Sequence, residues 1–445
     1  MSNVRVIQTA QGTDDRLTEK AALTFVPDQD GRENQLINVY DDVEYQEFIG
    51  FGGALTEASA VSIAKLSEDK QNEILQAYFD KESGIGYTFC RSHINSCDFS
   101  LGNYAYVEEE DPTLENFDIS RDREAIMPLI SKAAQTAGAE FKLFSSPWSP
   151  PAWMKTNGEM NNGGKLKPEY QEAWAQYFVK YIQAYEAEGI PIWGLSVQNE
   201  AKAKQIWDSC IYTAEEEKNF VRDYLGPALE QNGLGHVKVM IWDHNKERVY
   251  DRAKVAFEDA AASKYIWGIG FHWYSGDHFE ALTAVHDRFP DKALVFTEGC
   301  QEGGVHLGSW KTGERYGHDI MGNLNNWMSA WTDWNVVLDE QGGPNHVGNY
   351  CDAPIIADTV NNEVIYESSY YYIGQFSKFI KPGAKRIASS KYTDQLETTA
   401  FKNQDGSIAV VVMNRTDKAL PYALRYQDQL ADTEIPAHAI QTLIF

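Results

Sequence analysis

The sequence is poor in cysteine, in clustered basic residues and in long apolar runs. Five cysteines are scattered over 445 residues without a C-x-x-C pair, which argues against a disulfide framework or a zinc motif. Lysine and arginine total 39 against 65 aspartates and glutamates, a formal net charge of −26. That charge repels phosphate backbones, so we expect no nucleic acid partner. No stretch is long and apolar enough to cross a bilayer, so we expect no integral membrane segment.

Other signals that mark particular classes are also missing. The N-terminal sequence MSNVRVIQTAQGTDD lacks the apolar core of a secretory signal, so the expected location is the cytoplasm, with signal-independent export left open. The glycines at 50–53 and 158–164 do not have the register of a dinucleotide fingerprint or a phosphate loop. Neither H-E-x-x-H nor G-x-S-x-G occurs, which argues against a zinc peptidase and a serine hydrolase.

Aromatic residues are abundant, at 13% of the chain with 12 tryptophans and 24 tyrosines. Their flat apolar faces suit the apolar faces of sugar rings as well as a protein core. Hydrophobic residues make up 43%, and the length fits one large domain with an accessory one.

Strand-like apolar runs alternate with helical patterns through the middle of the chain. This alternation favours an α/β fold, a closed (β/α)8 TIM barrel, over an open doubly wound sheet, which periodicity alone leaves as the alternative. Helical spacing is clear at 174–185 and 126–134, and Thr213-Ala-Glu-Glu has the pattern of a capping box. The eight predicted strands are Phe48–Gly53, Gly86–His93, Glu140–Ser146, Ile190–Gln198, Val237–Asp243, Tyr265–Tyr274, Ala293–Glu298 and Ala330–Leu338.

The two ends of the chain have a different pattern. Residues 396–403, 407–415 and 437–445 have the composition of β segments with turn residues between them, and short β-like runs occur at 4–8 and 35–39. We predict that residues 46–381 form the catalytic barrel. Because domain termini often lie close together, we predict that residues 1–45 and 382–445 together form an all-β sandwich accessory domain.

Two of the barrel strands end in a carboxylate, at Glu200 and Glu298. The carboxyl ends of barrel strands carry catalytic groups, and glycosidic cleavage needs one protonated and one ionised carboxyl group across a single pocket. Asn199 beside Glu200 is a candidate to bond a sugar hydroxyl. Trp148, His272 and Tyr274, near other strand ends, are expected to line the mouth of the same pocket. Arg91 is expected to be a cation in the pocket wall that keeps the carboxylates ionised. A metal site built from His93, Asp243, His272 and Glu298 is a weaker interpretation, because no ligand spacing supports it.

Nine ordered motifs resemble those of glycoside hydrolase family 30, in particular its glucosylceramidase branch. The likeness runs from about residue 48 to the C-terminus. The motifs are Gly50-Phe-Gly-Gly-Ala-Leu-Thr-Glu57, Ser96-Cys-Asp-Phe-Ser100, Ser146-Pro-Trp-Ser-Pro-Pro-Ala-Trp-Met-Lys-Thr-Asn157, Asn199-Glu200, His272-Trp-Tyr274, Glu298-Gly-Cys300, Leu307-Gly-Ser-Trp310, Trp331-Thr-Asp-Trp-Asn335 and Gly342-Gly-Pro-Asn345.

The resemblance implies a role for each matching position. Glu200 matches the acid/base and Glu298 the nucleophile. Arg91, His272 and Tyr274 match the shell that supports the nucleophile, and His272 and Tyr274 are also expected in the substrate site. No cofactor or metal is implied. The residues that match those holding the sugar ring are Asp98, Trp148, Asn199, Trp334 and Asn349.

The expected function is a retaining, exo-acting β-glycosidase that cleaves a β-glucoside, either a small glycoside or a glycolipid. Its two carboxyl groups should then lie about 5–5.5 Å apart. β-1,6-Glucan, β-xylosides and β-fucosides remain alternative substrates. A catalytically silent carbohydrate-binding protein and a metal-dependent barrel enzyme remain alternative functions, and the oligomeric state is open. Ala201 stands where relatives carry proline after the acid/base, so the shape of the following loop and the aglycone preference are open.

Overall fold

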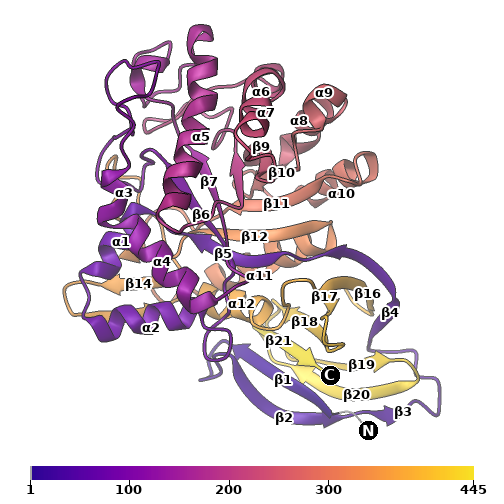
Figure 1. Cartoon of the computed structure of the whole chain (residues 1–445). Helices are drawn as coiled ribbons and strands as arrows, with labels where there is room; N and C mark the ends of the chain where they lie inside the picture. The colour runs from indigo at the N-terminus through magenta and orange to yellow at the C-terminus, as the bar shows by residue number, and fades with distance from the viewer. Residues whose placement is uncertain (1–2) are drawn as a thin grey trace.

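The computed structural model describes residues 3–445 and contains a closed barrel of eight parallel strands (Figure 1). The strands pair in chain order, and β12 pairs with β5 to close the barrel. The predicted fold class is confirmed, and each predicted run overlaps one barrel strand. The barrel strands are β5 (Gly50–Ala54), β6 (Phe89–Ile94), β7 (Lys142–Pro147), β8 (Gly194–Ser196), β9 (Lys238–Asn245), β10 (Gly268–His272), β11 (Ala293–Glu298) and β12 (Met328–Asn335).

Helices follow the strands and surround the barrel (Figure 1). The capping box at Thr213 is confirmed, since its hydroxyl accepts from the Glu216 amide and the Glu216 carboxylate accepts from the Thr213 amide. The helices are α1 (Glu57–Ala64), α2 (Glu68–Phe79), α3 (Ser120–Glu124), α4 (Ile126–Ala137), α5 (Gln171–Ala187), α6 (Ala214–Phe220), α7 (Gly226–Gln231), α8 (Val249–Phe257), α9 (Ala260–Ser263), α10 (Phe279–Arg288), α11 (Trp310–Asn325) and α12 (Ser368–Ser377).

The glycine-rich start of the barrel has a packing role. A Cβ atom added at Gly52 in β5 would lie 1.8 Å from the carbonyl oxygen of Phe89 in β6, so only glycine permits this approach. Phe89, Phe144 and Met240 belong to a cluster of buried side chains from five of the barrel strands. As is usual in such barrels, the interior is packed rather than a pore.

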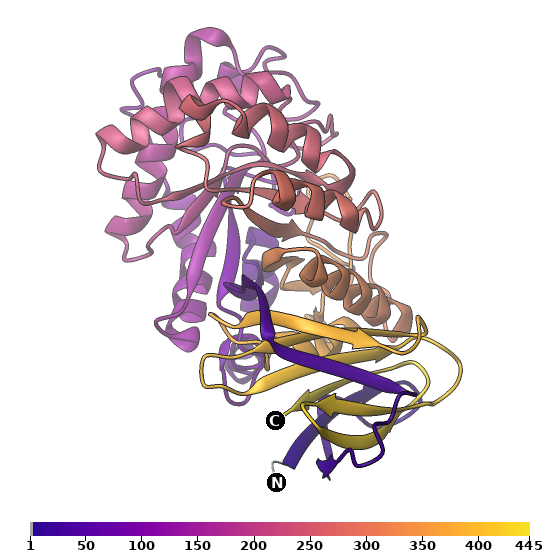
Figure 2. The same cartoon turned by 90° about the vertical axis from the view of Figure 1, so that its right-hand side faces the viewer.

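A ten-stranded sheet forms the second unit, and both termini lie in it (Figures 1 and 2). β1 (Asn3–Ala10) pairs with β21 (Ala439–Ile444), and β4 (Leu36–Glu47) pairs with β16 (Lys385–Lys391). The predicted sandwich built from terminal segments is therefore present, around its own core. The remaining strands of this sheet are β2 (Thr18–Thr24), β3 (Val26–Pro27), β17 (Leu396–Lys402), β18 (Ile408–Asn414), β19 (Leu420–Tyr426) and β20 (Gln429–Ile435).

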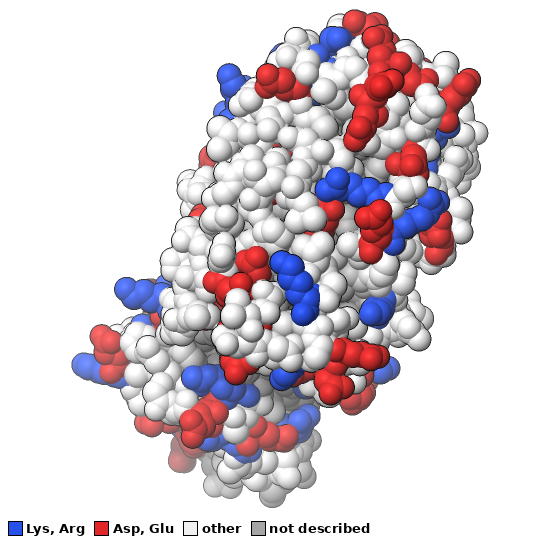
Figure 3. Space-filling view, turned by 90° about the vertical axis from the view of Figure 1, so that its left-hand side faces the viewer, with Lys and Arg blue, Asp and Glu red and all other residues white. Residues whose placement is uncertain are grey.

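Helices α11 and α12 pack against this sheet, and a small sheet of β13 (Val337–Asp339), β14 (Ile355–Asp358) and β15 (Glu363–Tyr366) follows β12. Within residues 3–445, every helix is too short or too polar to cross a lipid bilayer. On the face shown in Figure 3, acidic and basic side chains are interspersed and a broad stretch carries neither.

Candidate active site

A cavity of about 290 Å³ opens at the carboxyl ends of the barrel strands, where Glu200 and Glu298 both contribute to its wall. Polar groups and tryptophan faces share the lining, a mixture that suits a hydroxylated ring with apolar faces. The lining residues are Asp98, Trp148, Asn199, Glu200, Gln205, Trp207, His244, Asn245, Tyr274, Glu298, Cys300, Glu302, Trp334, Asn349 and Cys351.

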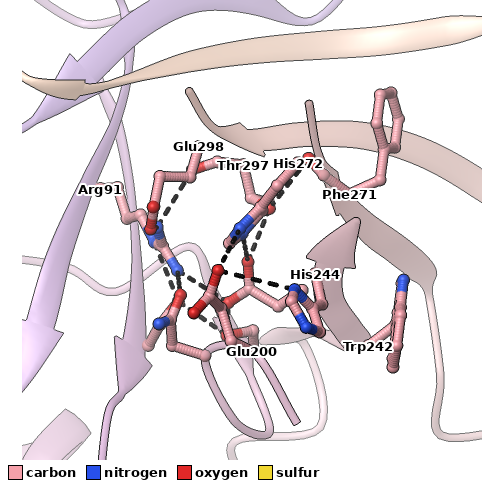
Figure 4. Close-up of polar contacts among 12 residues, drawn as sticks. Arg91, Glu200, Trp242, His244, Phe271, His272, Thr297 and Glu298 are labelled. Carbon is pink, nitrogen blue, oxygen red and sulfur yellow. Dashed lines mark hydrogen bonds and ion pairs between the residues drawn. The ribbon is translucent and has the colours of Figure 1, made fainter. Parts of the chain in front are cut away.

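Glu298 is the last residue of β11, and both of its carboxylate oxygens are held (Figure 4). Nη1 of Arg91 donates to Oε2 at 2.7 Å, and the hydroxyl of Tyr274 donates to Oε1 at 3.0 Å. Burial raises the pKa of Glu298, while His272 and Arg91 oppose that rise. The carboxylate is thus fixed in one orientation beside a permanent cation.

Arg91 in β6 is fully buried and links three elements. Its Nη2 donates at 2.8 Å both to Oδ2 of Asp243 and to Oδ1 of Asn199. The guanidinium lies 4.7 Å from the ring centre of Trp148, a cation–π contact. Because two buried carboxylates share this cation, the position of Arg91 sets the geometry of the whole site.

Asp243, near the end of β9, anchors the other side of the cluster. Burial opposes its ionisation, but Arg91 and His272 outweigh that effect and hold the pKa of Asp243 well below its usual range. Oδ1 of Asp243 accepts from Nε2 of His272 at 2.9 Å and from the Thr297 hydroxyl at 2.6 Å. The sequence analysis considered Asp243 only as a metal ligand, although it ends an apolar run just as Glu200 and Glu298 do.

Glu200 lies in the turn after β8, with a left-handed backbone at φ 50° and an amide that donates to the Asp243 carbonyl oxygen at 2.8 Å. Its Oε1 lies 3.5 Å from Nδ1 of His244 and 3.5 Å from Nδ1 of His272 (Figure 4). Burial disfavours the charged form of Glu200, but contacts with His272 and His244 outweigh burial and lower its pKa.

His272 has the complementary shift. Burial lowers the pKa of His272, but Glu298, Asp243 and Glu200 together raise it to about 9. These opposite shifts favour the proton of the pair on the imidazole of His272, whose Nδ1 lies 3.5 Å from Oε1 of Glu200.

The opposite wall combines stacked tryptophan rings with hydrogen-bonding groups. Trp148 and Trp334 stack with ring centres 5.1 Å apart and planes at 17°. Asp98 Oδ2 accepts from the amide nitrogens of Asn349 at 3.1 Å and Asn345 at 3.2 Å. Burial raises the pKa of Asp98 to about 7. Carboxyl and amide groups held in this way can exchange hydrogen bonds with ring hydroxyls.

Most of the predicted site residues lie in the cavity wall. His272 does not: it is fully buried behind Glu200, so it contacts the cluster rather than the cavity, and Arg91 lies behind the wall as well. The predicted metal set does not come together, because His93 contacts the Glu57 amide and the Asn95 carbonyl instead. Sequence reasoning missed several lining residues that no motif marks. Gln205, Trp207, Glu302 and Cys351 lie in loops, and His244 and Asn245 lie at the end of β9.

The backbone around Ala201 is held without proline. Its carbonyl oxygen accepts from the Tyr212 amide at 2.8 Å, and the Ala203 amide donates to the Glu200 carbonyl oxygen at 2.8 Å. The side chain of Ala201 is fully buried. These bonds fix the turn that carries Glu200.

Comparison with known proteins identifies the family that this site belongs to. Residues 48–380 match the TIM-barrel domain of glycosyl hydrolase family 30, and residues 383–443 match the beta sandwich domain of the same family. The chain belongs to glycosyl hydrolase family 30. This family 30 protein is therefore a glycoside hydrolase, and the resemblance expected from its motifs is confirmed.

Relatives of this family 30 chain include enzymes of two kinds. It is 36% identical over 431 residues to the lysosomal acid glucosylceramidase of Mus musculus, covering 92% of this chain and 83% of the relative. It is 30% identical over 389 residues to an endo-1,6-beta-D-glucanase of Neurospora crassa, covering 83% and 79%. The crystal structure of SrfJ from Salmonella typhimurium superposes with a TM-score of 0.96 at 39% identity, over 100% of this chain and 99% of that one.

Proposed function

We propose that this protein is a retaining, exo-acting β-glucosidase of the glucosylceramidase type. The observation that carries the proposal is that Glu200, from the turn after β8, and Glu298, at the end of β11, share one small cavity walled by tryptophan. Glucosylceramidase relatives of similar length support the choice of a β-glucoside.

In the proposed reaction Glu298 attacks the anomeric carbon while Glu200 protonates the departing oxygen. Arg91 and Tyr274 hold the two oxygens of Glu298, so the attacking lone pair is oriented before substrate arrives. Glu200 receives the proton that it donates from His272, whose Nδ1 lies 3.5 Å from Oε1 of Glu200.

Water then releases the sugar, with Glu200 as the base. Once Glu298 is esterified its negative charge is lost, and a like charge no longer faces Glu200. The pKa of Glu200 is lower in that intermediate than before, because the repulsion between the two carboxylates has gone. Glu200 is then ionised and ready to accept a proton from water.

The size of the cavity supports exo action. About 290 Å³ is at the lower end of ligand pockets, which suits a single ring. A second candidate is endo-β-1,6-glucanase activity, favoured by the Neurospora crassa relative. The products separate the two: glucose is released first by an exo enzyme, whereas oligosaccharides appear first with an endo enzyme.

The test is hydrolysis of an aryl β-glucoside followed by NMR, with glucosylceramide, β-1,6-glucan, β-xylosides and β-fucosides as a substrate panel. We expect the β-anomer of glucose to appear first and to mutarotate later. Initial release of the α-anomer would show an inverting enzyme, and no hydrolysis of any member would favour a carbohydrate-binding protein. Glu298→Gln is the negative control.

A further inference from the structure

Three potential metal ligands converge at the mouth of the barrel. They are Oε1 of Glu200 and the Nδ1 atoms of His244 and His272, and all three atoms lie within 4.8 Å of one another (Figure 4). Each Nδ1 is buried and has no hydrogen-bond partner, and each lies 3.5 Å from the carboxylate oxygen. Buried polar atoms are nearly always satisfied, so two unpartnered nitrogens aimed at one point indicate a missing ligand.

The surroundings orient these nitrogens toward one point. Nε2 of His272 donates to the Asp243 carboxylate at 2.9 Å, so Nδ1 is the nitrogen that faces Glu200 and binds an ion once its proton is released. A carboxylate behind a histidine is the usual second shell of a metal site. The His244 ring packs against Trp242 with centres 5.0 Å apart. Neither ring needs to reorient to reach the ion.

The ion pairs of the cluster leave Glu200 free to bind a cation. The guanidinium of Arg91 is paired with Asp243 at 2.8 Å and with Glu298 at 2.7 Å. Among the ion pairs of residues 3–445, Glu200 has no arginine or lysine partner, only the two imidazoles. A divalent ion that displaced the imidazole proton would keep the Glu200 carboxylate paired with a cation.

We propose that Glu200, His244 and His272 bind a divalent transition-metal ion, Zn²⁺ by its ligand chemistry, and that the bound ion inhibits hydrolysis. Two imidazole nitrogens and one carboxylate oxygen, with a fourth position open to the cavity, form a ligand set that Zn²⁺ uses. Mg²⁺ and Ca²⁺ prefer oxygen ligands and should not compete. The ion takes the place of the proton between Glu200 and His272. The inhibitory part of the inference rests on the proposed acid/base role of Glu200.

Calorimetric titration of the full chain with ZnCl₂ in chelator-treated buffer tests the site without reference to activity. One ion should bind per chain, and His244→Gln should weaken binding at least tenfold. The matched control is His236→Gln, because His236 is an exposed histidine outside the cavity. Equal affinity in the wild type and His244→Gln, or no binding at all, would overturn the site. Zn-edge anomalous diffraction from Zn²⁺-soaked crystals of the wild-type protein gives a second readout that does not depend on the fold of the variant. A peak about 2.0–2.2 Å from the three ligand atoms is expected, and a peak elsewhere would contradict the assignment.

Inhibition is measured in parallel with an aryl β-glucoside. Zn²⁺ should abolish hydrolysis over the concentration range in which it binds, EDTA should restore hydrolysis, and Mg²⁺ should have no effect. Stoichiometric binding at this site with full activity would overturn the inhibitory role and also contradict Glu200 as acid/base. Hydrolysis by a protein that does not bind Zn²⁺ would contradict the metal site but would not contradict the proposed function.

Discussion

Two pairs of histidines in the molecule have opposite surroundings. At the seam between the barrel and the sandwich, His318 of α11 contacts Glu397 of β17 and Asp277, and His438 contacts Glu314 of α11 and Asp417. Both ring nitrogens of each seam histidine are paired with a carboxylate. At the mouth, Nδ1 of His272 and Nδ1 of His244 have no hydrogen-bond partner.

The difference separates stability from function. A seam histidine links the barrel to the sandwich through its two carboxylate partners and leaves no ring nitrogen unpaired. An unpaired buried nitrogen costs about 1–3 kcal/mol, and left-handed backbone of the kind seen at Glu200, Trp242 and Asp243 costs a similar amount. Such costs persist in folded proteins mainly where binding or chemistry requires them. Three variants test whether the residues at the mouth determine activity and the residues at the seam determine stability.

The largest expected effect is on activity at the mouth. Glu200→Ala removes the proposed proton donor, so hydrolysis of a glycoside with a poor leaving group should fall by about 10²–10⁴-fold. An activated aryl glucoside needs little protonation and should lose much less in the glycosylation step. Steady-state kinetics with both substrates measure the contrast, and equal losses would rule out an acid role.

Arg91→Met should affect stability as well as activity. It leaves Asp243 and Glu298 buried without their shared cation, which typically costs about 3–5 kcal/mol. Urea unfolding measures the loss. The control is Lys385→Met, whose solvent-exposed pair with Glu44 at 2.8 Å should contribute little to stability. Similar losses in the two variants would mean that Arg91 is not the centre of the cluster.

The smallest effect is expected at the seam. The hydrogen bond to Glu397 raises the pKa of His318, so the stability that His318 contributes is complete below its unfolded pKa of about 6.5 and is lost as pH rises through the higher folded pKa. Burial opposes ionisation of Glu397, but His318 and Arg415 lower its pKa, so its contribution is lost as pH falls through that lower value.

His318→Gln should therefore reduce the unfolding free energy most between those two pKa values, and least in alkaline solution. Thermal unfolding across pH measures the difference, and hydrolysis at neutral pH should stay at the wild-type level. A stability difference that grows above the folded pKa of His318 would contradict this account, and a large loss of activity would show that mouth and seam are coupled.

Sequence patterns predict the barrel well because its strands are nearly continuous apolar runs that end in polar residues. The sandwich was harder to predict. β1, β4, β17, β18 and β21 carry enough buried residues to stand out in the sequence as apolar runs, whereas β2 is largely exposed and does not. The strands β16, β19 and β20 have mixed burial and were likewise missed.

The same contrast applies to the site. Glu200 and Glu298 were predicted from their places after apolar strand runs, and the sugar-binding residues were predicted from the family resemblance; the structure places both glutamates in one cavity wall. His244, Gln205 and Trp207 reach the cavity from loops or from a strand end without a motif, and only the closure of the barrel brings them together. Sequence position does not show that the imidazole of His272 lies behind Glu200 instead of in the cavity, because that depends on the side-chain packing between β9 and β10.

Covalent trapping tests the central claim most directly. A 2-fluoro β-glucoside with a good leaving group should inactivate the enzyme and add one fluoroglucosyl group per chain, which peptide mass spectrometry should locate on Glu298. A label on another residue, or turnover without any label, would contradict the proposed nucleophile and with it the double displacement.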